Sequence, residues 1–552
     1  MTTFFFLLFN LVLILCFRGL LISIKIISKK DYSVDTFKVS GVPLFIFYPI
    51  LTFFIIGNLS VLLNFFFPIK NLKFFWLLFL IFFLLMNLRE PVLYKNNVFL
   101  ISSFLIIPAI LSISSYGMKF HFDAIDYHLN FQYWLRESKI VFGLSNLYIS
   151  YGWSNIYEYI LSNFWVKDRF IGLHFVNIIF FTFFYNFIFY NIAFSKNLYL
   201  KYLSINIALF SFLDNFGING GANGFVNIQM VGKPDEAVGI MFFVSFIMLL
   251  GDILKKNFSI NNFLFLCTIS LFTFQLKINS AMLIFPLIIY LINLKNQKFS
   301  KTQTSYFLIL IFTSIIYFLK NLIISGCLIF PINQTCINYL PWTNTENVQN
   351  FSQRVMGENN ALRFNQNFIS WFDNWINSAY NYQIYFNLLI SLLIIWIFNK
   401  VMYKKTANNY SINEKISFLL IISIAVTFFI TGPTLRYGFG VFLILISGFS
   451  IGQKIIRYEN HFKKVVYVVS LILFLSVGLT PRMYSYIEFL ENPFTLTKIR
   501  DNTEEYLNLG SLKDLEVKNI EKSVCFIPKT CIKNPNYKSL VYSEIYKYKL
   551  YK

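Results

Sequence analysis

Long apolar runs recur from one end of the chain to the other, separated by short polar connections. Runs of about 17–25 apolar residues have the length that a helix needs to cross a bilayer. We place them at roughly 3–24, 43–67, 72–88, 98–115, 170–193, 198–213, 237–254, 260–276, 279–294, 305–324, 385–400, 415–431, 438–452 and 464–480. The pattern predicts an all-α polytopic membrane protein with about fourteen transmembrane helices.

Composition supports this class and excludes others. Hydrophobic residues make up 57% of the chain, charged residues 13%, and the mean hydropathy is +0.60. The 47 Lys and Arg against 26 Asp and Glu give a net charge of +21, which in a soluble protein would suggest nucleic acid. Here the basic residues gather in short connections, where they set orientation and contact anionic lipids. We therefore expect membrane lipids as partners and no nucleic acid.

The distribution of Lys and Arg predicts which connections face the cytoplasm. The connections following the first, third, fifth, seventh, ninth, eleventh and thirteenth runs are rich in Lys and Arg. Both termini then lie outside, together with three long loops and the tail after residue 480. The three loops are 116–169, 214–236 and 325–384, and every candidate site below falls on this extracytoplasmic face.

Two close cysteine pairs lie in connections that the topology places outside. They are Cys327 with Cys336, and Cys525 with Cys531. Close pairs in an oxidising compartment can form disulfides. The alternative is that they are free thiols kept as small apolar residues, and the spacing does not match a strong zinc pattern.

The first polar loop carries Asp123, Asp126 and His128 just after an apolar run. On a helical turn the two carboxylates would share a face at the membrane boundary, one acting as a general base and the other as an orienter or metal ligand. Alternatively, Asp123 caps the helix that follows. His128 is a candidate phosphate or metal ligand, or it packs against a neighbouring aromatic ring.

A second charged group lies directly before the apolar run that begins at residue 237. It consists of Lys233, Asp235 and Glu236 in the sequence KPDE. A helix N-terminus stabilises nearby acidic residues, which is a structural alternative to a second acidic site. Lys277 and Arg436 lie between apolar runs on the outer side and could hold a lipid-linked phosphate. Both could instead extend to the interface as membrane anchors.

Five motifs, taken in order, resemble a family of bacterial multi-spanning proteins related to the GT-C glycosyltransferases. They are FDAIDYHLNFQYW with GLSNLYISYGWSN, KPDE, KINSAM, FLKNLIISGCLIFPINQTCINYLPW and LRYGFG. The resemblance implies a sugar donor carried on polyprenyl phosphate and a base at Asp123. It further implies a second acidic position at Asp235 and phosphate contacts at Lys277 and Arg436.

The resemblance also implies a domain organisation. A GT-C-like core would span 116–480. Because the acidic loop follows the fourth run here and the first run in better-known enzymes, 1–115 would be an added N-terminal bundle of about four helices. Residues 481–552 would form a short extracytoplasmic tail.

We therefore expect a glycosyltransferase in the bacterial plasma (inner) membrane. It would transfer a sugar from a polyprenyl-phosphate donor to an extracytoplasmic glycan, lipid or protein. A transporter or flippase for a lipid-linked saccharide and an O-antigen-type polymerase are the alternatives. The sequence leaves open whether a divalent cation takes part.

Overall fold

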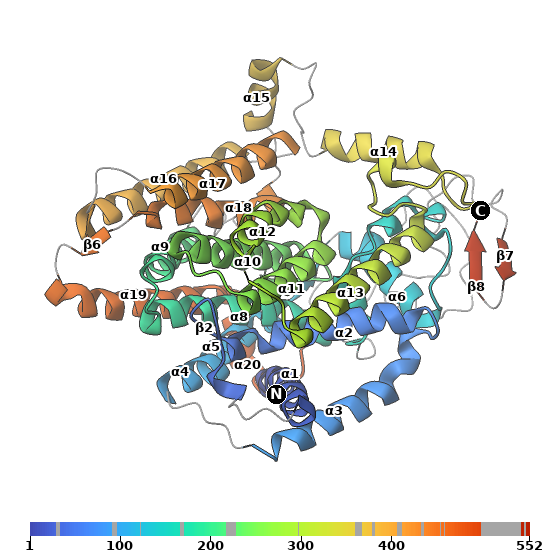
Figure 1. The fold of residues 1–552 in the computed structure, drawn as a ribbon, viewed down its shortest axis with the longest axis horizontal. Coiled ribbons are helices and arrows are strands. Elements are labelled where there is room, and N and C mark those ends of the chain that lie inside the picture. The colour runs from blue at the N-terminus through green and yellow to red at the C-terminus, as the bar shows by residue number, and fades with distance from the viewer. Residues whose placement is uncertain are drawn as a thin grey trace.

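The computed structural model of the chain is built almost entirely from helices joined by short connections (Figure 1). It describes residues 1–28, 34–90, 97–121, 123–165, 170–216, 228–295, 297–358, 367–377, 381–405, 411–431, 435–452, 454–456, 459–497, 542–545 and 548–551.

Nine helices in this described part are long and apolar enough to cross a membrane. These spans are Thr2–Ile27, Leu44–Asn64, Ile69–Asn87, Val98–Gly117, Ile171–Phe194, Asp235–Lys255, Lys301–Ser325, Tyr385–Met402 and Ile412–Ile430. The helices that form them are α1 (Thr2–Ser28), α2 (Tyr48–Asn64), α3 (Lys73–Asn87), α4 (Asn97–Ile101) with α5 (Ile107–Ser112), α8 (Ile171–Phe194), α10 (Asp235–Lys255), α13 (Lys301–Ser325), α16 (Asn381–Met402) and α17 (Ile412–Thr431). The fold is all-α and that of a multi-pass membrane protein.

The remaining predicted spans also coincide with helices, but these fall short in length or hydropathy. They are α9 (Leu198–Asn215), α11 (Ile260–Leu276), η12 (Ile278–Leu283) with α12 (Ile284–Asn293), α18 (Leu435–Ser447) and α19 (Glu459–Leu479). α19 continues through a 69° bend into α20 (Met483–Glu491), and the two count as one span only if taken together. The expected number of about fourteen is therefore not confirmed, because nine or ten helices of the described part meet the criteria.

Burial separates central from peripheral helices. In α8 and α10, 94% of the apolar span is buried inside the protein, whereas the values are 17% for α3 and 22% for α16 and α17. Apolar side chains on all sides of α8 and α10 suit a helix surrounded by other helices. The exposed leucines and phenylalanines of α3, among them Phe74 and Leu85, suit contact with lipid.

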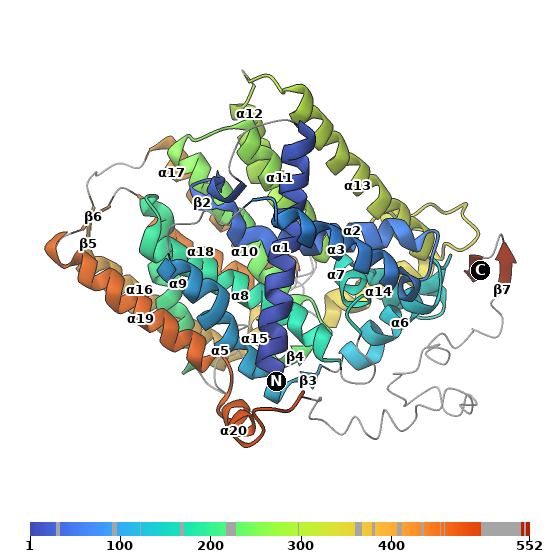
Figure 2. The same cartoon turned by 90° about the horizontal axis from the view of Figure 1, so that it is seen from below.

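Hydrogen bonds between distant segments define two ends of the bundle. At one end, the amino group of Met1 donates to the carbonyl of Pro493 at 2.6 Å, and Figure 2 shows α20 close to the N-terminus. We call this the site end. At the opposite end, the Ser40 hydroxyl donates to Asp252 of α10 at 2.7 Å, and Asn413 at the start of α17 donates to the Ile253 carbonyl at 2.7 Å.

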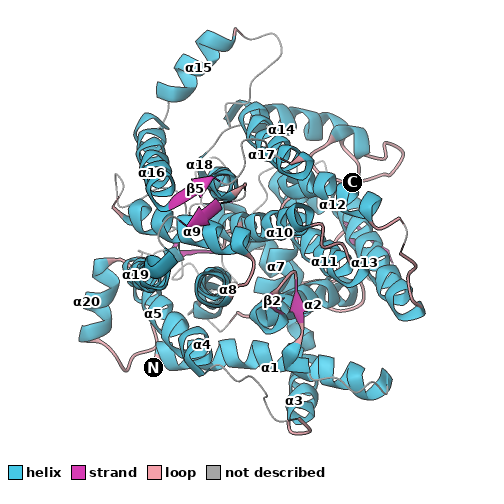
Figure 3. Cartoon of the chain, turned by 60° about the vertical axis from the view of Figure 1, so that its left-hand side comes forward, coloured by secondary structure: helices cyan, strands magenta, loops and turns pink. Residues whose placement is uncertain are grey.

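Strands are few and short, as Figure 3 shows. Four two-stranded pairs occur in the described part: β1 (Lys38–Val39) with β2 (Val42–Pro43), β3 (Lys119–Phe120) with β4 (Met230–Val231), β5 (Tyr403–Lys405) with β6 (Lys454–Ile456), and β7 (Tyr542–Ile545) with β8 (Tyr548–Tyr551). Only β3 and β4 run parallel. A parallel pair from distant segments fixes their register without a tight turn, and this pair leads into the candidate site.

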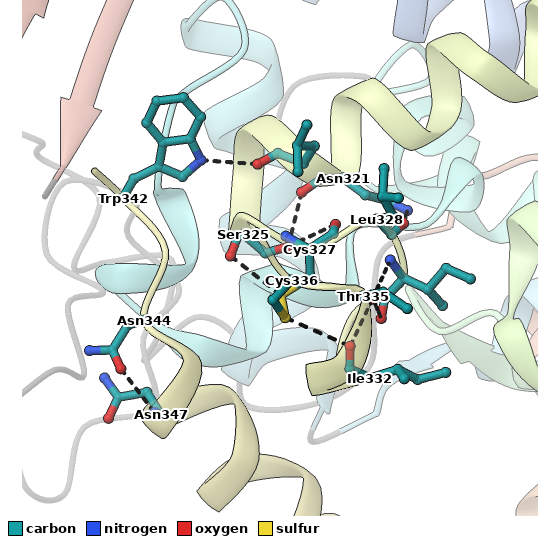
Figure 4. Close-up of a disulfide and its surroundings, with 12 residues drawn as sticks. Asn321, Ser325, Cys327, Leu328, Ile332, Thr335, Cys336, Trp342, Asn344 and Asn347 are labelled. Atoms are coloured by element: carbon teal, nitrogen blue, oxygen red, sulfur yellow. Dashed lines mark hydrogen bonds between the residues drawn. A yellow bond between two sulfur atoms is a disulfide. The ribbon is translucent and has the colours of Figure 1, made fainter. Parts of the chain in front are cut away.

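The loop after α13 starts with a disulfide between Cys327 and Cys336 (Figure 4). Trp342 then turns back, and its indole N–H donates to the Leu322 carbonyl of α13 at 3.0 Å. Asn146, from the loop that holds Asp123, donates to the Trp342 carbonyl at 3.0 Å. The two long loops are thus joined at the site end. The disulfide loop leads on to α14 (Thr345–Glu358) and α15 (Phe368–Asn377), while Cys525 and Cys531 lie outside the described residues.

Candidate functional site

The β3–β4 pair brings the two predicted acidic segments together. Asp123 follows β3, which ends at Phe120, and Asp235 follows β4, which ends at Val231. Asn177 of α8 donates to two carbonyls of the β4 segment, at 3.0 and 3.2 Å. The pair is therefore fixed to a central helix.

The segments also touch just beyond the strands. Gly232 has a positive φ of 93°, and a Cβ atom added there would lie 2.8 Å from the Cβ of Ala124. A side chain at this position would be strained and would push the two segments apart. Gly232 and Ala124 are 108 positions apart in the sequence, so this contact makes the loops of Asp123 and Asp235 immediate neighbours.

A charge cluster of Lys233, Asp235, Glu236 and Lys277 surrounds the start of α10. The Lys277 ammonium donates to a carboxylate oxygen of Asp235 at 2.7 Å. The Lys233 ammonium lies 3.9 Å from an oxygen of Asp235 and 3.9 Å from one of Glu236. Lys233, Asp235 and Glu236 are buried, while the Lys277 side chain keeps 23% of its surface exposed. Lys277 thus contacts an acid of the cluster instead of serving only as a membrane anchor.

Asp235 and Lys277 also line a pocket of about 120 Å³ between α10, η12, α17 and α18. Asn279 and Ser280 add polar groups beside Lys277, whereas the rest of the lining is mostly apolar. The apolar part comprises Val238, Gly239, Phe242, Met282, Ile424, Phe428, Gly440 and Val441, with Thr427 the one hydroxyl among them. The pocket is therefore ionic at one side and apolar at the other.

Glycines let α10 and α18 approach each other at this pocket. A Cβ atom on Gly440 would lie 2.7 Å from the Gly239 carbonyl oxygen, so no larger residue fits without moving a helix. Arg436 lies one turn before Gly440 on α18. The helix that carries this predicted phosphate contact thus lines the pocket, and the Arg436 side chain itself lies outside the described part.

Asp123 and Asp126 have different partners. A π-helical turn, Ala124–His128, connects them to α6 (Leu129–Glu137), and its wider winding changes which residues share a face. Asp123, 20% exposed, lies 3.5 Å from the ring of His121, while buried Asp126 accepts a hydrogen bond from the Tyr148 hydroxyl at 2.6 Å. The Asp123 side chain makes no helix-capping hydrogen bond, so the alternative as a cap is not supported.

His128 belongs to a buried chain of polar side chains that the sequence did not reveal. Its Nδ1 atom is hydrogen-bonded to Glu158 of α7 (Ile156–Leu161). Gln132 donates to the other Glu158 oxygen at 2.7 Å and accepts from the Trp165 indole N–H at 2.8 Å. A carboxylate bound to one ring nitrogen fixes the orientation of an imidazole. The His128 ring also lies against Tyr127, with 4.1 Å between centroids, so both expected roles are compatible with its position.

Tyr157 links this chain to the charge cluster. Its hydroxyl is buried and has no hydrogen-bond partner among the described residues. Burial, then the negative charges of Glu236, Glu158 and Asp235, raises the pKa of Tyr157 well above its usual value. A neutral phenol therefore lies among carboxylates that come from two distant segments.

Lys320 of α13 anchors the segment before α7. Its fully buried side-chain nitrogen donates to the Ser154 carbonyl and lies 4.1 Å from the centre of the Tyr317 ring. Asn155 then caps α7 by accepting from the Glu158 N–H at 3.1 Å. Glu158 and His128 are 30 positions apart in the sequence, so no local pattern predicts their contact.

No group of three or more His, Cys, Asp or Glu suited to a metal ion occurs among the residues that the structure describes. The arrangement instead offers two ammonium groups, a partly exposed carboxylate and a histidine fixed by a glutamate. Such groups can bind a phosphate and exchange a proton with a hydroxyl.

Residues 1–443 match the family described as a domain of unknown function, DUF8201. The chain therefore belongs to the DUF8201 family. The match runs from α1 into α18 and includes the whole charge cluster, the pocket and Arg436. No curated protein and no solved structure matches this DUF8201 protein at a significant level. What the site does must therefore be argued from its chemistry.

Proposed function

We propose that this protein is a membrane glycosyltransferase that uses a polyprenyl-phosphate sugar. The observation that carries the proposal is the pocket beside Lys277 and Asp235. Its polar side suits a phosphate, and its apolar side, between α10, α17 and α18, suits a hydrocarbon chain. A lipid could enter it sideways, since α17 is a peripheral helix with 22% of its span buried.

In the proposed reaction, Asp123 accepts the proton of an acceptor hydroxyl. The acceptor oxygen bonds to the anomeric carbon from the side opposite the phosphate, and the bond from that carbon to the phosphate oxygen breaks. Lys277 and Lys233 stabilise the negative charge on the departing polyprenyl phosphate, with Arg436 assigned to the same role by the resemblance. His128, held by Glu158, binds the acceptor.

The expected orientation places this site on the extracytoplasmic face of a bacterial inner membrane, with about fourteen crossings. The disulfide between Cys327 and Cys336 supports the orientation, because disulfides persist in oxidising compartments. The contact between Met1 and Pro493 supports an even number of crossings, since it places the start of the chain and the segment after the last predicted span on one side.

A buried charge inside a membrane span can indicate a transport path. The charge inside the first span here, Arg18, is instead paired with Asp35. Arg18, inside the first span, donates twice to Asp35, each time at 2.9 Å. Ionisable residues on a transport path usually face a cavity or a partner that changes. This fixed pair supports the enzyme over the transporter or flippase.

The test is transfer of a labelled sugar from its polyprenyl phosphate by the protein in reconstituted vesicles. We expect Asp123→Asn to lower turnover by about 100-fold or more while donor binding is retained. Asp373→Asn, which changes an exposed aspartate of α15, is the matched control and should keep full activity. Undiminished turnover in Asp123→Asn would remove this residue from the mechanism, and a wild-type protein without transfer would reject the function.

A further inference from the structure

A small polar cavity lies inside the membrane bundle, away from the candidate site. It is lined by residues of α1, η2 (Leu44–Phe47), α2, α8 and the π-helical segment η4 (Ser102–Ile106). Four polar side chains line it: Asn10, Ser103, Thr182 and Asn186. The first three are 2–3% exposed.

Each of these four side chains has a buried oxygen with no hydrogen-bond partner among the described residues. The atoms are Oδ1 of Asn10, Oγ of Ser103, Oγ1 of Thr182 and Oδ1 of Asn186. An unsatisfied buried polar atom destabilises the folded protein, and the cost is higher where lipid replaces water. Four such atoms around one cavity therefore point to a bound ligand.

Proline explains why the cavity is here. In η4, the N–H of Ile107 bonds to the Ser102 carbonyl, so the Ser103 carbonyl would need the next N–H along the chain. Residue 108 is proline and has none. The Nδ2 group of Asn186 donates to the Ser103 carbonyl instead, at 3.1 Å, and this bond leaves the Asn186 Oδ1 atom facing the cavity.

We propose that this cavity holds one water molecule that joins the N-terminal helices to α8. About 10 Å³ is open to the centre of a water molecule, close to the minimum that one water needs. The two amide oxygens can only accept, whereas the hydroxyls of Ser103 and Thr182 can donate. A water donates two hydrogen bonds and accepts two, so it satisfies all four groups.

A monovalent cation is the competing occupant. It would bind the oxygen lone pairs but leave both hydroxyl protons without an acceptor, and no carboxylate lines the cavity to balance its charge. Water therefore matches the lining better.

The sign of a stability change tests the proposal on the full chain in lipid nanodiscs. Thr182→Val keeps the shape and removes one donor. With water bound, the melting temperature should fall by about 1–3 °C, and Thr182→Ser should restore it. In a dry cavity the same change removes an unsatisfied hydroxyl, so an unchanged or higher melting temperature would overturn the proposal. Thr313→Val is the matched control for the substitution and should leave the melting temperature nearly unchanged, because the Thr313 hydroxyl donates to the Ile309 carbonyl of its own helix.

A structure at a resolution that shows ordered water gives the direct test. We expect one peak about 2.7–3.2 Å from the four oxygens, present equally in sodium chloride and in choline chloride. A peak or a stabilisation that requires sodium would replace water by a cation, and an empty cavity would reject both.

Discussion

Two buried charge clusters at opposite ends of the bundle differ in how completely their groups are paired. The Arg18 cluster is formed by Arg18, Asp35, Asn87 and Glu90. The guanidinium donates twice to Asp35 at 2.9 Å, to Asn87 at 3.0 Å and to the Glu90 carbonyl at 3.2 Å. A planar cation with a bidentate carboxylate and two further acceptors is well satisfied.

The charge cluster at the site end is less complete. Among the described residues of the cluster, Lys277 and Asp235 are within hydrogen-bond distance of each other at 2.7 Å, whereas both ion pairs of Lys233 are 3.9 Å long. The Oε2 atom of Glu236 is buried without a hydrogen-bond partner among the described residues. This cluster borders a pocket, whereas the Arg18 cluster joins α1 to Asp35 and to Asn87 of α3. In line with the proposed function, we expect the Arg18 cluster to stabilise the fold and the charge cluster to bind the ligand.

The largest expected effect tests the structural side of this comparison. Arg18→Met should lower the free energy of unfolding by about 3–5 kcal/mol, because Asp35 is left buried without its cation. Denaturation of the purified protein in detergent measures the change. The double variant Arg18→Met with Asp35→Leu should regain most of the loss, since no unpaired charge remains. A single variant as stable as the wild type would show that Asp35 does not need Arg18.

The second prediction concerns the ligand-binding side. Lys277→Met should lower sugar transfer by about 100-fold and change the free energy of unfolding by about 1 kcal/mol or less, because Lys233 remains near Asp235 and Lys277 is partly exposed. Transfer in vesicles and denaturation in detergent measure the two effects. Lys70→Met, which breaks an exposed pair with Glu137, is the control and should change neither. A loss of stability as large as that of Arg18→Met would remove the distinction between the clusters.

The sequence predicted the positions of the membrane helices because apolar runs of sufficient length are a local signal. Their number could not be predicted in this way. α11 and α18 are short apolar helices, and an apolar run alone does not show whether a short helix crosses the membrane. The Arg18–Asp35 pair was missed for a related reason. Asp35 lies in a connection, and nothing local shows that it folds back onto the first span.

The candidate site shows the same limit. Charged residues at span ends identified Asp235 and Lys277 separately, and the structure shows them in contact. The three-residue spacing of Asp123 and Asp126 suggested a shared face, but a π-turn intervenes and gives the carboxylates different partners. Glu158 and Tyr157 could not be assigned, because their roles depend on contacts with other segments.

The smallest expected effect distinguishes two tyrosines of α7. The hydroxyls of Tyr157 and Tyr159 are both buried without a hydrogen-bond partner among the described residues, but only Tyr157 lies near the acids of the site. Replacing either by Phe removes an unsatisfied group, so stability at neutral pH should stay the same or rise by about 1 kcal/mol.

Alkaline pH should enlarge this gain. Burial raises the pKa of Tyr157 in the folded protein, so above about pH 10 the unfolded chain releases a proton that the folded chain keeps. The wild type therefore loses stability as the pH rises, and Tyr157→Phe lacks that loss.

Activity then separates the two positions. Tyr157→Phe should slow transfer by about 10-fold if its hydroxyl contacts the ligand, whereas Tyr159→Phe should not. Equal activity in both variants would show that α7 lies outside the site and that the charge cluster binds the ligand without it.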